Sequence, residues 1–415
     1  MRRSRSVQMM AAFCVCVVVV AACGSDKKTA TTTAATATTV ASTTASTTAA
    51  ASTTAAASTT ETTAAGVETT AGSSGVDAAT ANAAKYKSVP TAITQTKSLS
   101  AKPPTKKVGF VVCADPSCEI LSSYLKEAIG SFGWDLVTVN APPTDPGSAV
   151  QQLIDAGVDY VGETGINMDQ FQSQADELKS KGIPLFECYA TDVSAGESNN
   201  LYSDCFDASA ADVYGAALAD WVIADSGGKA HAVIVNLPAF PILTAQGDAV
   251  KKELAANCPD CTADLLEPTI DDLTSGNLPT LLVSYLQTHT DVNYIYETFE
   301  GFDLTGISAA VGAAGLQDRV KIVGEQAFSS EMQEIIDGTE DAWSELPEEL
   351  SMWSMADQMA RLANNEWTVE NERANAIPPF FIIDSVDVAK QMVDLKYGWP
   401  GPDGFKDAYK KLWGV

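Results

Sequence analysis

Histidine and positive charge are the scarcest features of this 415-residue sequence. It has two histidines, His231 and His289, and its 26 lysines and arginines stand against 53 aspartates and glutamates, for a net charge of −27 at pH 7. Two histidines leave little material for a histidine-rich metal site or a catalytic histidine relay. The negative charge argues against nucleic-acid binding, because the phosphates would be repelled rather than neutralised.

Common catalytic and nucleotide-binding motifs are absent as well. The sequence has no Gly-x-Ser-x-Gly nucleophile elbow, no phosphate-binding P-loop and no paired-histidine zinc motif. We therefore expect no catalytic residue, no metal and no cofactor. Hydrophobic residues make up 46% of the chain, which is ample for a packed core. The length favours about two to three domains.

The first 22 residues have the features of a signal peptide. Three arginines among the first five residues precede an apolar run over residues 9–20, which is too short for a confident membrane span. The following Val20-Ala-Ala-Cys23 resembles the lipobox of bacterial lipoproteins. We expect cleavage before Cys23 and a lipid on its thiol. The alternative is an ordinary secretory signal peptide followed by a chance cysteine.

A low-complexity segment follows the expected lipid anchor. Residues 29–60 contain only Thr, Ala, Ser and one Val, without a charge. Such a composition cannot bury enough apolar surface to offset chain entropy, so we expect residues 23–104 to be a disordered, lipid-anchored linker. For about 80 residues the root-mean-square reach of a flexible chain is on the order of 50 Å.

From Lys106 onward, strand-like and helix-like segments alternate in two consecutive units. The strand-like segments are residues 107–112, 134–139, 158–161 and 183–186, then 230–235, 263–266, 294–296 and 320–323. The helix-like segments are residues 118–132, 147–156 and 169–181, then 210–224, 243–256, 278–287 and 304–314. This alternation predicts an α/β fold with two similar doubly wound parallel-sheet lobes.

Six short phrases in this part of the chain carry a family resemblance. They are Lys107-Val-Gly-Phe, Asp155-Ala-Gly-Val-Asp-Tyr-Val161, Lys181-Gly-Ile-Pro184, Asp291-Val-Asn-Tyr-Ile-Tyr296, Lys321-Ile-Val-Gly324 and Glu345-Leu-Pro347. Over residues 105–400 the sequence resembles the type I periplasmic solute-binding proteins, specifically the ribose/galactose-like sugar-binding lipoproteins of ABC importers.

The resemblance implies a fold and a division into lobes. It implies a ligand cleft between two lobes that are joined by a three-crossing hinge, with crossings near residues 207–210, 346–347 and 383–385. The N-terminal lobe is expected to comprise residues 105–208 and 347–383, and the C-terminal lobe residues 209–346 and 384–415.

The function implied by the resemblance is binding rather than catalysis. An extracytoplasmic protein, lipid-anchored to the outer face of the cell membrane, would bind a small polar solute by hinge closure and deliver it to the permease and ATPase subunits of an ABC importer. Two alternatives remain. One is an exported enzyme, either a redox protein using Cys258 and Cys261 or a hydrolase. The other is a ligand-sensing subunit of a membrane receptor.

Ligands of open parallel sheets lie beyond the carboxyl ends of the strands, so the loops there supply the candidate binding residues. Their carboxylates and amides suit hydroxyl groups, and their rings suit the C–H face of a sugar. The alternative for each glutamate is a solvated surface position, and for each aromatic residue a packing role. The candidates are Asp115, Glu163, Asn167, Tyr189, Asp192, Phe240, Thr244, Phe299, Glu300, Glu325, Gln326 and Glu345.

Three departures from the sugar-binding relatives bear on the ligand. Phe299-Glu300 stands where those relatives usually have Asn-Asp, Glu325-Gln326 where they have Asp, and Thr244 where an arginine is common. The expected site is therefore more acidic than theirs and lacks a cation. We expect a sugar, a polyol or an amino sugar, with an amino group favoured by the added carboxylates.

Six cysteines remain beyond Cys14, Cys16 and Cys23, and they allow fifteen pairings. An oxidising exterior favours disulfides. The spacing suggests the pairs Cys113–Cys118, Cys188–Cys205 and Cys258–Cys261. The last pair also matches the CxxC spacing of redox sites and half of a zinc site. It follows a helical stripe instead of beginning a helix, which favours a structural loop staple.

Overall fold

The structure is a computed structural model that describes residues 71–113 and 117–415. The expected signal peptide, Cys23 and the first part of the expected linker lie outside the described residues, as does Asp115. Within the part that the structure describes, no helix is long and apolar enough to cross a membrane.

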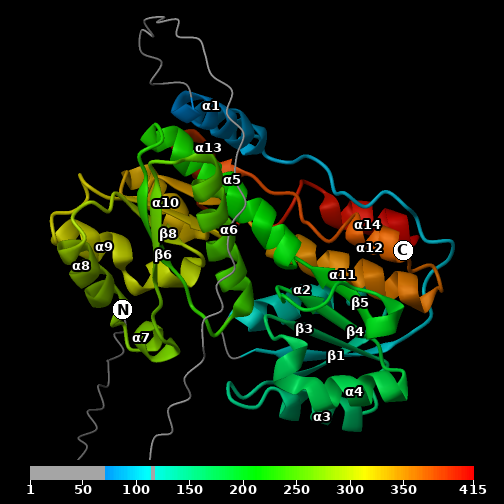
Figure 1. The fold of residues 1–415 in the computed structure, drawn as a ribbon. Coiled ribbons are helices and arrows are strands. Elements are labelled where there is room, and N and C mark those ends of the chain that lie inside the picture. Colours follow the sequence, from blue (N-terminus) through cyan, green and yellow to red (C-terminus); the bar gives the residue numbers. More distant parts are fainter. Residues whose placement is uncertain (1–70, 114–116) are drawn as a thin grey trace, which may run out of the picture. The chain divides into compact units, whose positions relative to one another are not determined.

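The N-terminal lobe is built on a five-stranded parallel sheet with the order β2-β1-β3-β4-β5 (Figure 1). The strands are β1 (Lys107–Val112), β2 (Asp135–Asn140), β3 (Tyr160–Thr164), β4 (Leu185–Cys188) and β5 (Leu201–Cys205). Strands β3 and β4 are buried at every residue, as expected for a parallel sheet covered on both faces.

Helices cover both faces of this sheet, with α3 and α4 on one face and α11 on the other in Figure 1. The helices of the lobe are α2 (Ser117–Gly130), α3 (Gly147–Asp155), α4 (Gln172–Lys181), α11 (Glu348–Ala363), α12 (Val369–Arg373) and α14 (Phe405–Trp413). A short 3₁₀ turn, Met168–Phe171, leads into α4, and another, Glu197–Asn199, precedes β5.

The C-terminal lobe has a six-stranded sheet with the order β11-β10-β9-β8-β6-β7, in which only β11 runs antiparallel among the described strands. The strands are β6 (His231–Val235), β7 (Thr262–Leu266), β8 (Tyr294–Glu297), β9 (Lys321–Glu325), β10 (Ala342–Ser344) and β11 (Ile382–Ile383). The helices are α5 (Ala208–Ser226), α6 (Pro241–Asn257), α7 (Ile270–Thr274), α8 (Leu278–Thr288), α9 (Ile307–Ala313), α10 (Ser329–Asp337) and α13 (Val386–Met392). The expectation of two doubly wound α/β lobes is confirmed.

Helices α5 and α6 approach each other closely at Gly215. A Cβ atom there would lie 2.9 Å from the Cβ of Ala249 and 2.9 Å from the carbonyl oxygen of Gln246. Any side chain at this position would push α6 outward. The glycine therefore fixes where α6, and with it Gln246, lies relative to the sheet.

Strand β5 was not recognised in the sequence, because two of its five residues are polar. Ser203 and Asp204 are both buried. The Asp204 carboxylate accepts a hydrogen bond from Ala195 N at 2.8 Å, and Asp204 N donates to Glu372 Oε1 at 3.2 Å. These tertiary bonds compensate the burial of polar atoms, and no local pattern reveals them.

The crossings between the lobes differ from the expected three. After β11, which belongs to the C-terminal sheet, the chain continues through α13 and then returns to the N-terminal lobe as α14. Trp413 of α14 stacks on Trp353 of α11 with the ring centroids 5.3 Å apart. Assigning all of residues 384–415 to the C-terminal lobe was therefore wrong, because the apolar face of α14 is buried in the other core. The expected lobe boundary at residue 383 is also too late, because β11 (Ile382–Ile383) already belongs to the C-terminal sheet.

The expected disordered linker was wrong for residues 71–104. Helix α1 (Ala71–Ala83) packs against α5, and Ala79 and Ala83 are buried in the core of the C-terminal lobe. A 3₁₀ turn, Ala84–Tyr86, follows, and the ring of Tyr86 stacks on Phe380 at 4.5 Å. Small alanine side chains pack closely here without producing the large apolar stripe that marks a helix in sequence.

Residues 87–104, here called the strap, then connect the two lobes. Lys87 forms an ion pair of 2.6 Å with Asp384, which lies directly after β11. Further along, Leu99 N donates a hydrogen bond of 2.8 Å to Leu412 O of α14. The strap therefore contacts the C-terminal lobe at one end and the N-terminal lobe at the other.

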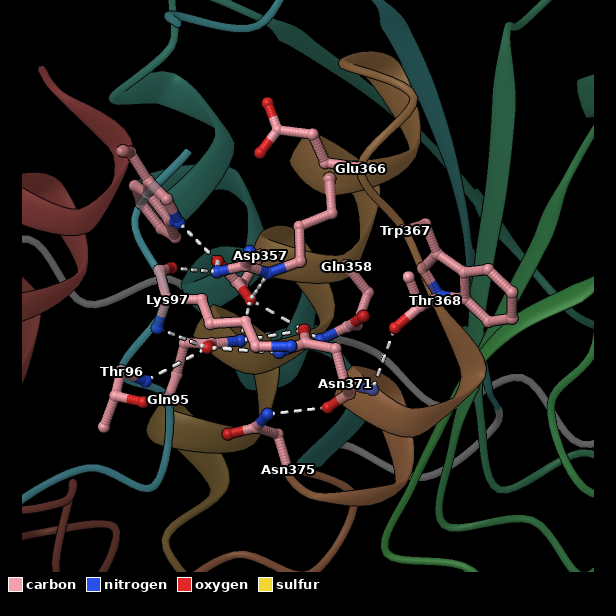
Figure 2. A network of polar contacts seen from close by, with 12 residues as sticks. Gln95, Thr96, Lys97, Asp357, Gln358, Glu366, Trp367, Thr368, Asn371 and Asn375 are labelled. Carbon is pink, nitrogen blue, oxygen red and sulfur yellow. Dashed lines mark hydrogen bonds and ion pairs between the residues drawn. The ribbon is translucent and has the colours of Figure 1, made fainter. Parts of the chain in front are cut away.

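Figure 2 shows the polar network that fastens the strap to α11 and α12. The Gln95 side-chain amide donates to Asp357 at 2.7 Å and to Asn371 at 3.0 Å. Asp357 also accepts from Arg361 Nε at 2.7 Å, and Arg361 donates to the backbone carbonyl of Lys97 at 2.5 Å. Gln95, Asp357 and Arg361 are all at most 3% exposed, so the network is a buried one whose members satisfy each other.

The six cysteines form the three pairs that their spacing suggested. Cys113 is bonded to Cys118, Cys188 to Cys205, and Cys258 to Cys261. The second pair joins the ends of the adjacent strands β4 and β5, where Cys188 and Cys205 are register partners.

Candidate functional site

A cavity of about 70 Å³ lies between the two lobes, where the carboxyl ends of their strands face each other. Each lobe contributes wall residues at the ends of its strands or just after them: Thr164 and Tyr189 from the N-terminal lobe, and Phe299, Gln326 and Leu346 from the C-terminal lobe. This is the place at which open parallel sheets hold ligands. The full wall is Cys113, Cys118, Leu121, Thr164, Gly165, Tyr189, Phe206, Phe240, Ile242, Leu243, Gln246, Phe299, Gln326, Leu346 and Glu348.

Four aromatic rings line the cavity. Phe240 directly precedes α6, whose first residue is a proline and so begins the helix at a defined point. Phe299 packs edge-on against Phe302 with the centroids 5.8 Å apart, and Tyr189 lies 5.4 Å from Phe206. Tyr189 has a φ of 61°, a strained backbone for a tyrosine that turns the chain sharply after β4.

The loop after β3 meets Phe240 from the opposite lobe. Gly165 in this loop has a φ of 74°, which disfavours any other residue, and a Cβ there would lie 3.7 Å from Phe240 Cδ1. Thr164 is buried, and its hydroxyl points at Cys118 Sγ, 3.8 Å away. This part of the N-terminal wall is therefore formed by backbone, a disulfide and a hydroxyl group.

The polar side chains of the C-terminal wall are the amides of Gln246 and Gln326, and the carboxylate of Glu348, at the start of α11, meets the second of them. Gln326, at a φ of 68°, donates through Nε2 to Oε1 of Glu348. Gln246 donates through Nε2 to Glu325 Oε2, which lies behind the wall. Gln246 is 3% exposed, and its Oε1 has no hydrogen-bond partner among the described residues. That oxygen is an unused acceptor on a residue of the cavity wall.

Four of the twelve candidate residues lie on the cavity: Tyr189, Phe240, Phe299 and Gln326. The four candidate glutamates Glu163, Glu300, Glu325 and Glu345 are buried but do not line it. These four glutamates are therefore not part of the wall of this cavity.

Three of these glutamates hold their own surroundings together instead. Glu163 Oε2 accepts from Ile166 N at 3.0 Å, and Glu345 Oε2 accepts from Trp399 N at 3.2 Å. Glu325 accepts from the Tyr296 hydroxyl as well as from Gln246. Burial raises the pKa of Glu325 to about 7 and that of Glu345 to about 8, and it raises the pKa of Glu163 well above its usual value. These side chains therefore stabilise their surroundings by accepting hydrogen bonds, and they carry less negative charge than the sequence suggests.

The remaining described candidates fix loops. The Asn167 side chain donates to Thr191 Oγ1 at 2.8 Å and accepts from Thr191 N at 3.1 Å. Asp192 accepts from Met168 N at 2.6 Å, so these bonds join the loops after β3 and β4. Thr244 of α6 accepts from the Asn236 amide at 3.2 Å, next to the end of β6.

The sequence did not single out most of the apolar wall. Leu121, Ile242 and Leu243 lie in the first turns of α2 and α6, and Leu346 and Glu348 lie where the chain crosses from β10 to α11. The signal that could have found them is position, because the first turn of a helix that follows a strand faces the same edge of the sheet as the loop before it.

A second cavity of about 200 Å³ adjoins the first and shares Cys113, Gly165 and Phe240 with it. Its other wall residues, again from both lobes, are Ala141, Pro142, Pro143, Pro146, Ile166, Gln170, Ala239, Ile270, Leu273 and Thr274. Most of these side chains are apolar, so the hydrophobic character of the first cavity continues into the second.

Comparison with known proteins agrees with this architecture. A family model described as a periplasmic binding protein domain matches residues 108–366. No curated protein matches the sequence.

Solved structures with the same fold include two transporter proteins and one binding protein. An ABC sugar transporter subunit from Rhodobacter sphaeroides is 19% identical with a TM-score of 0.56, over 68% of this chain and 98% of its own. The Caulobacter myo-inositol binding protein, bound to myo-inositol, is 18% identical with a TM-score of 0.58, over 70% and 97%. A carbohydrate transporter from Acidothermus cellulolyticus, in complex with myo-inositol, is 15% identical with a TM-score of 0.57, over 70% and 98%. At these identities the likeness is one of fold.

Proposed function

The chain belongs to the family of periplasmic binding protein domains, and from this premise we propose that it is the solute-binding component of an ABC importer. Members of this family bind substrates and do not convert them, so the chain is a binding protein and not an enzyme. The family also implies an extracytoplasmic location. The main support for this proposal is the cavity between the lobes, which is lined by residues at the strand ends of both.

Closure of the lobes around the solute is the proposed mechanism. An engineered cavity of about 150 Å³ in a protein interior binds a benzene molecule. The cavity here, about 70 Å³, is smaller than that, so a ring-sized solute requires the lobes to rotate apart about their connections and close again. Closure excludes water and lets both walls contact the solute at once.

The solute we propose is small, neutral and ring-shaped. Sugars and cyclitols fall within this description, and the names of the three similar structures mention sugar, carbohydrate or myo-inositol. An amino group on the solute was expected because of the added carboxylates. It is no longer favoured, because Glu163, Glu300, Glu325 and Glu345 do not line the cavity. Aromatic wall residues suit a neutral ring, because their π-faces pack against the C–H groups of the ligand.

Membrane attachment and partner proteins complete the proposal. A lipid on Cys23 would hold the protein at the outer face of the membrane, and residues between Cys23 and α1 would link the anchor to the folded part. The partners would be the permease and ATPase of the importer, which receive the solute from the closed form.

A thermal-shift screen tests the function. The mature protein is heated with a panel of neutral sugars, polyols, amino sugars, polyamines and simple cyclic alcohols. A ligand present at 100 times its Kd adds about 2.7 kcal/mol to the free energy of unfolding, so one class should raise the Tm clearly. Phe240→Ala or Phe299→Ala should remove most of that gain, while the exposed Glu119→Gln should not. No rise in Tm with any class, together with turnover of a chromogenic ester or disulfide, would refute the proposal.

A further inference from the structure

The composition of the cavity wall narrows the solute further. We propose that the cavity selects a mainly hydrocarbon ring, aromatic or alicyclic, that carries one hydrogen-bond donor, and that it rejects polyhydroxylated rings. This inference rests on the proposed function and names the substrate class of the same site.

The greater part of the wall is apolar. It consists of the Cys113–Cys118 disulfide, Leu121, Phe206, Phe240, Ile242, Leu243, Phe299 and Leu346. A hydroxyl group that is buried without a hydrogen-bond partner costs about 1–3 kcal/mol. A cyclitol or hexose carries five or six hydroxyls, and this wall would leave several of them unpaired.

The polar groups on the wall are few, and most of them already bond to protein atoms. Gln326 Nε2 donates to Glu348, Gln246 Nε2 donates to Glu325, and the Thr164 hydroxyl points at Cys118 Sγ. Two wall residues are exceptions, because the Oε1 atom of Gln246 and the hydroxyl oxygen of Tyr189 are buried and have no hydrogen-bond partner among the described residues. The Gln246 acceptor calls for a ligand donor, such as one hydroxyl or N–H group.

The charge on the wall excludes ionic ligands. No lysine or arginine is among the described wall residues, so an anion would find no countercharge. Among the described wall residues the one acidic residue is Glu348, whose carboxylate accepts a hydrogen bond from Gln326. The other carboxylates of this region, those of Glu163, Glu300, Glu325 and Glu345, are buried outside the wall. A neutral ligand is therefore favoured over an ammonium or a carboxylate.

The second cavity gives the ligand room for an apolar substituent. It is lined by three prolines together with Ile166, Ala239, Ile270 and Leu273, and it meets the first cavity at Phe240 and Gly165. A ring held against Phe240 could extend an alkyl group past it without meeting a charged described residue. The pair of cavities thus suits a substituted ring better than a compact polyol.

A matched pair of probes tests this specificity. Cyclohexanol and myo-inositol share a six-carbon ring and differ in carrying one hydroxyl or six. Calorimetric titration should show saturable binding of cyclohexanol, and more tightly of 4-ethylcyclohexanol and 4-ethylphenol, with no detectable binding of myo-inositol, glucose or glucosamine.

The hydrogen bond to Gln246 is tested with cyclohexanol and its methyl ether, which lacks the donor. The wild-type protein should prefer the alcohol by about 2–10-fold, the equivalent of one net hydrogen bond. In Gln246→Met this preference should disappear, so that both probes bind alike. Gln333→Met, on the exposed side of α10, should keep the preference. A ratio of two affinities is insensitive to a general loss of stability in the variant.

Three outcomes separate the two proposals. Tighter binding of myo-inositol or glucose than of any cyclic mono-alcohol would overturn the substrate class and leave the solute-binding function standing. A preference for the alcohol that persists in Gln246→Met would overturn the role of the Gln246 acceptor. If neither set of rings binds, the cavity is not a solute site and the proposed function falls with the inference.

Discussion

Glu187 is the residue whose burial is hardest to reconcile with a charge. It lies in β4 between Glu163 of β3 and Asp204 of β5, which are its register partners, and it is 0% exposed. Neither of its carboxylate oxygens has a hydrogen-bond partner in the described part of the chain. Burial, and then the neighbouring Glu163, raises the pKa of Glu187 well above its usual value. The folded state therefore favours its protonated form.

The substitution Glu187→Gln should stabilise the protein at pH 8 but not at pH 5. At pH 8, folding of the wild-type protein requires either burial of an ionised carboxylate or uptake of a proton by that carboxyl, and both cost free energy. The neutral amide of glutamine avoids both costs. We expect a gain on the order of 1 kcal/mol at pH 8, or about 2–4 °C in Tm for a domain of this size. Thermal unfolding at both pH values measures it, with the exposed Glu119→Gln as the control. An equal effect at pH 5 and pH 8 would show that Glu187 is not neutral when folded.

All six cysteines of the described part are paired, which gives a second prediction at this scale. Titration of the denatured, unreduced mature protein with a thiol reagent should find no free thiol other than at Cys23, if that residue lacks its lipid. The Cys258–Cys261 pair follows the end of α6 instead of beginning a helix, so helix dipole stabilisation of a thiolate is absent there. Two reactive thiols at Cys258 and Cys261 would instead support a redox role.

The sequence predicted which loops form the cavity better than which side chains line it. Phe240 and Phe299 could be predicted, because large aromatic rings in the loops after strands are expected to be buried at that edge of the sheet. Glu325 could not be assigned, because it is the last residue of β9 and one step along a strand reverses the direction of a side chain. Gln326, the next residue, is the one that lies on the cavity.

Among the elements, the strap is one that sequence reasoning missed, as it missed α1 and β5. It has no periodicity of its own, and its order comes from side chains more than 250 positions later, such as the contact of Gln95 with Asp357. Helix α14 shows a related limit. Its place in the N-terminal lobe depends on Trp353, the aromatic partner on which Trp413 stacks. Local pattern specifies an element, whereas docking depends on tertiary partners.

Removing one member of the strap network should destabilise the N-terminal lobe. Gln95→Ala deletes two donated bonds and leaves Asp357 and Asn371 with fewer partners in a buried place. The expected cost is about 1–3 kcal/mol, since buried polar groups lose compensation. Urea unfolding measures it, and the exposed Thr91→Ala serves as the control. Equal midpoints for Gln95→Ala and wild type would mean that the strap is not fastened as described.

The whole molecule carries many buried carboxyls, and this predicts how its stability depends on pH. Burial raises the pKa of Glu325 and Glu331 to about 7 and that of Glu345 and Glu372 to about 8. Unfolded glutamates titrate near pH 4.3. Between that pH and about 8 the folded state therefore holds more protons than the unfolded state, so stability falls as the pH rises.

Thermal melts in one buffer system should accordingly show a higher Tm at pH 5 than at pH 8. The net charge of −27 acts in the same direction, because self-repulsion grows as carboxyls ionise. Removing one contributor should flatten the profile, and Glu372→Gln is the variant of choice because it lies away from the cavity. A Tm that rises from pH 5 to pH 8 would contradict the neutral state of these groups.

Attachment to the membrane is also a property of the whole molecule. If Cys23 is acylated, Cys23→Ala should release the protein into the medium, because the lipid signal is lost. Detergent-phase partitioning of cell extracts measures this, with Cys23→Ser as a second variant. Unchanged partitioning of both variants would contradict lipid anchoring and leave solute binding untouched.

The central claim is that a solute binds between the lobes and that the lobes close on it. Small-angle X-ray scattering tests it most directly, on the protein alone and with the ring compound that raises the Tm most. We expect the compound to reduce the radius of gyration of the wild-type protein. At the same concentration it should leave the radius of gyration of Phe240→Ala unchanged, because the Phe240 ring lies on both cavities. Saturating binding with an unchanged radius of gyration would contradict closure and place the ligand elsewhere.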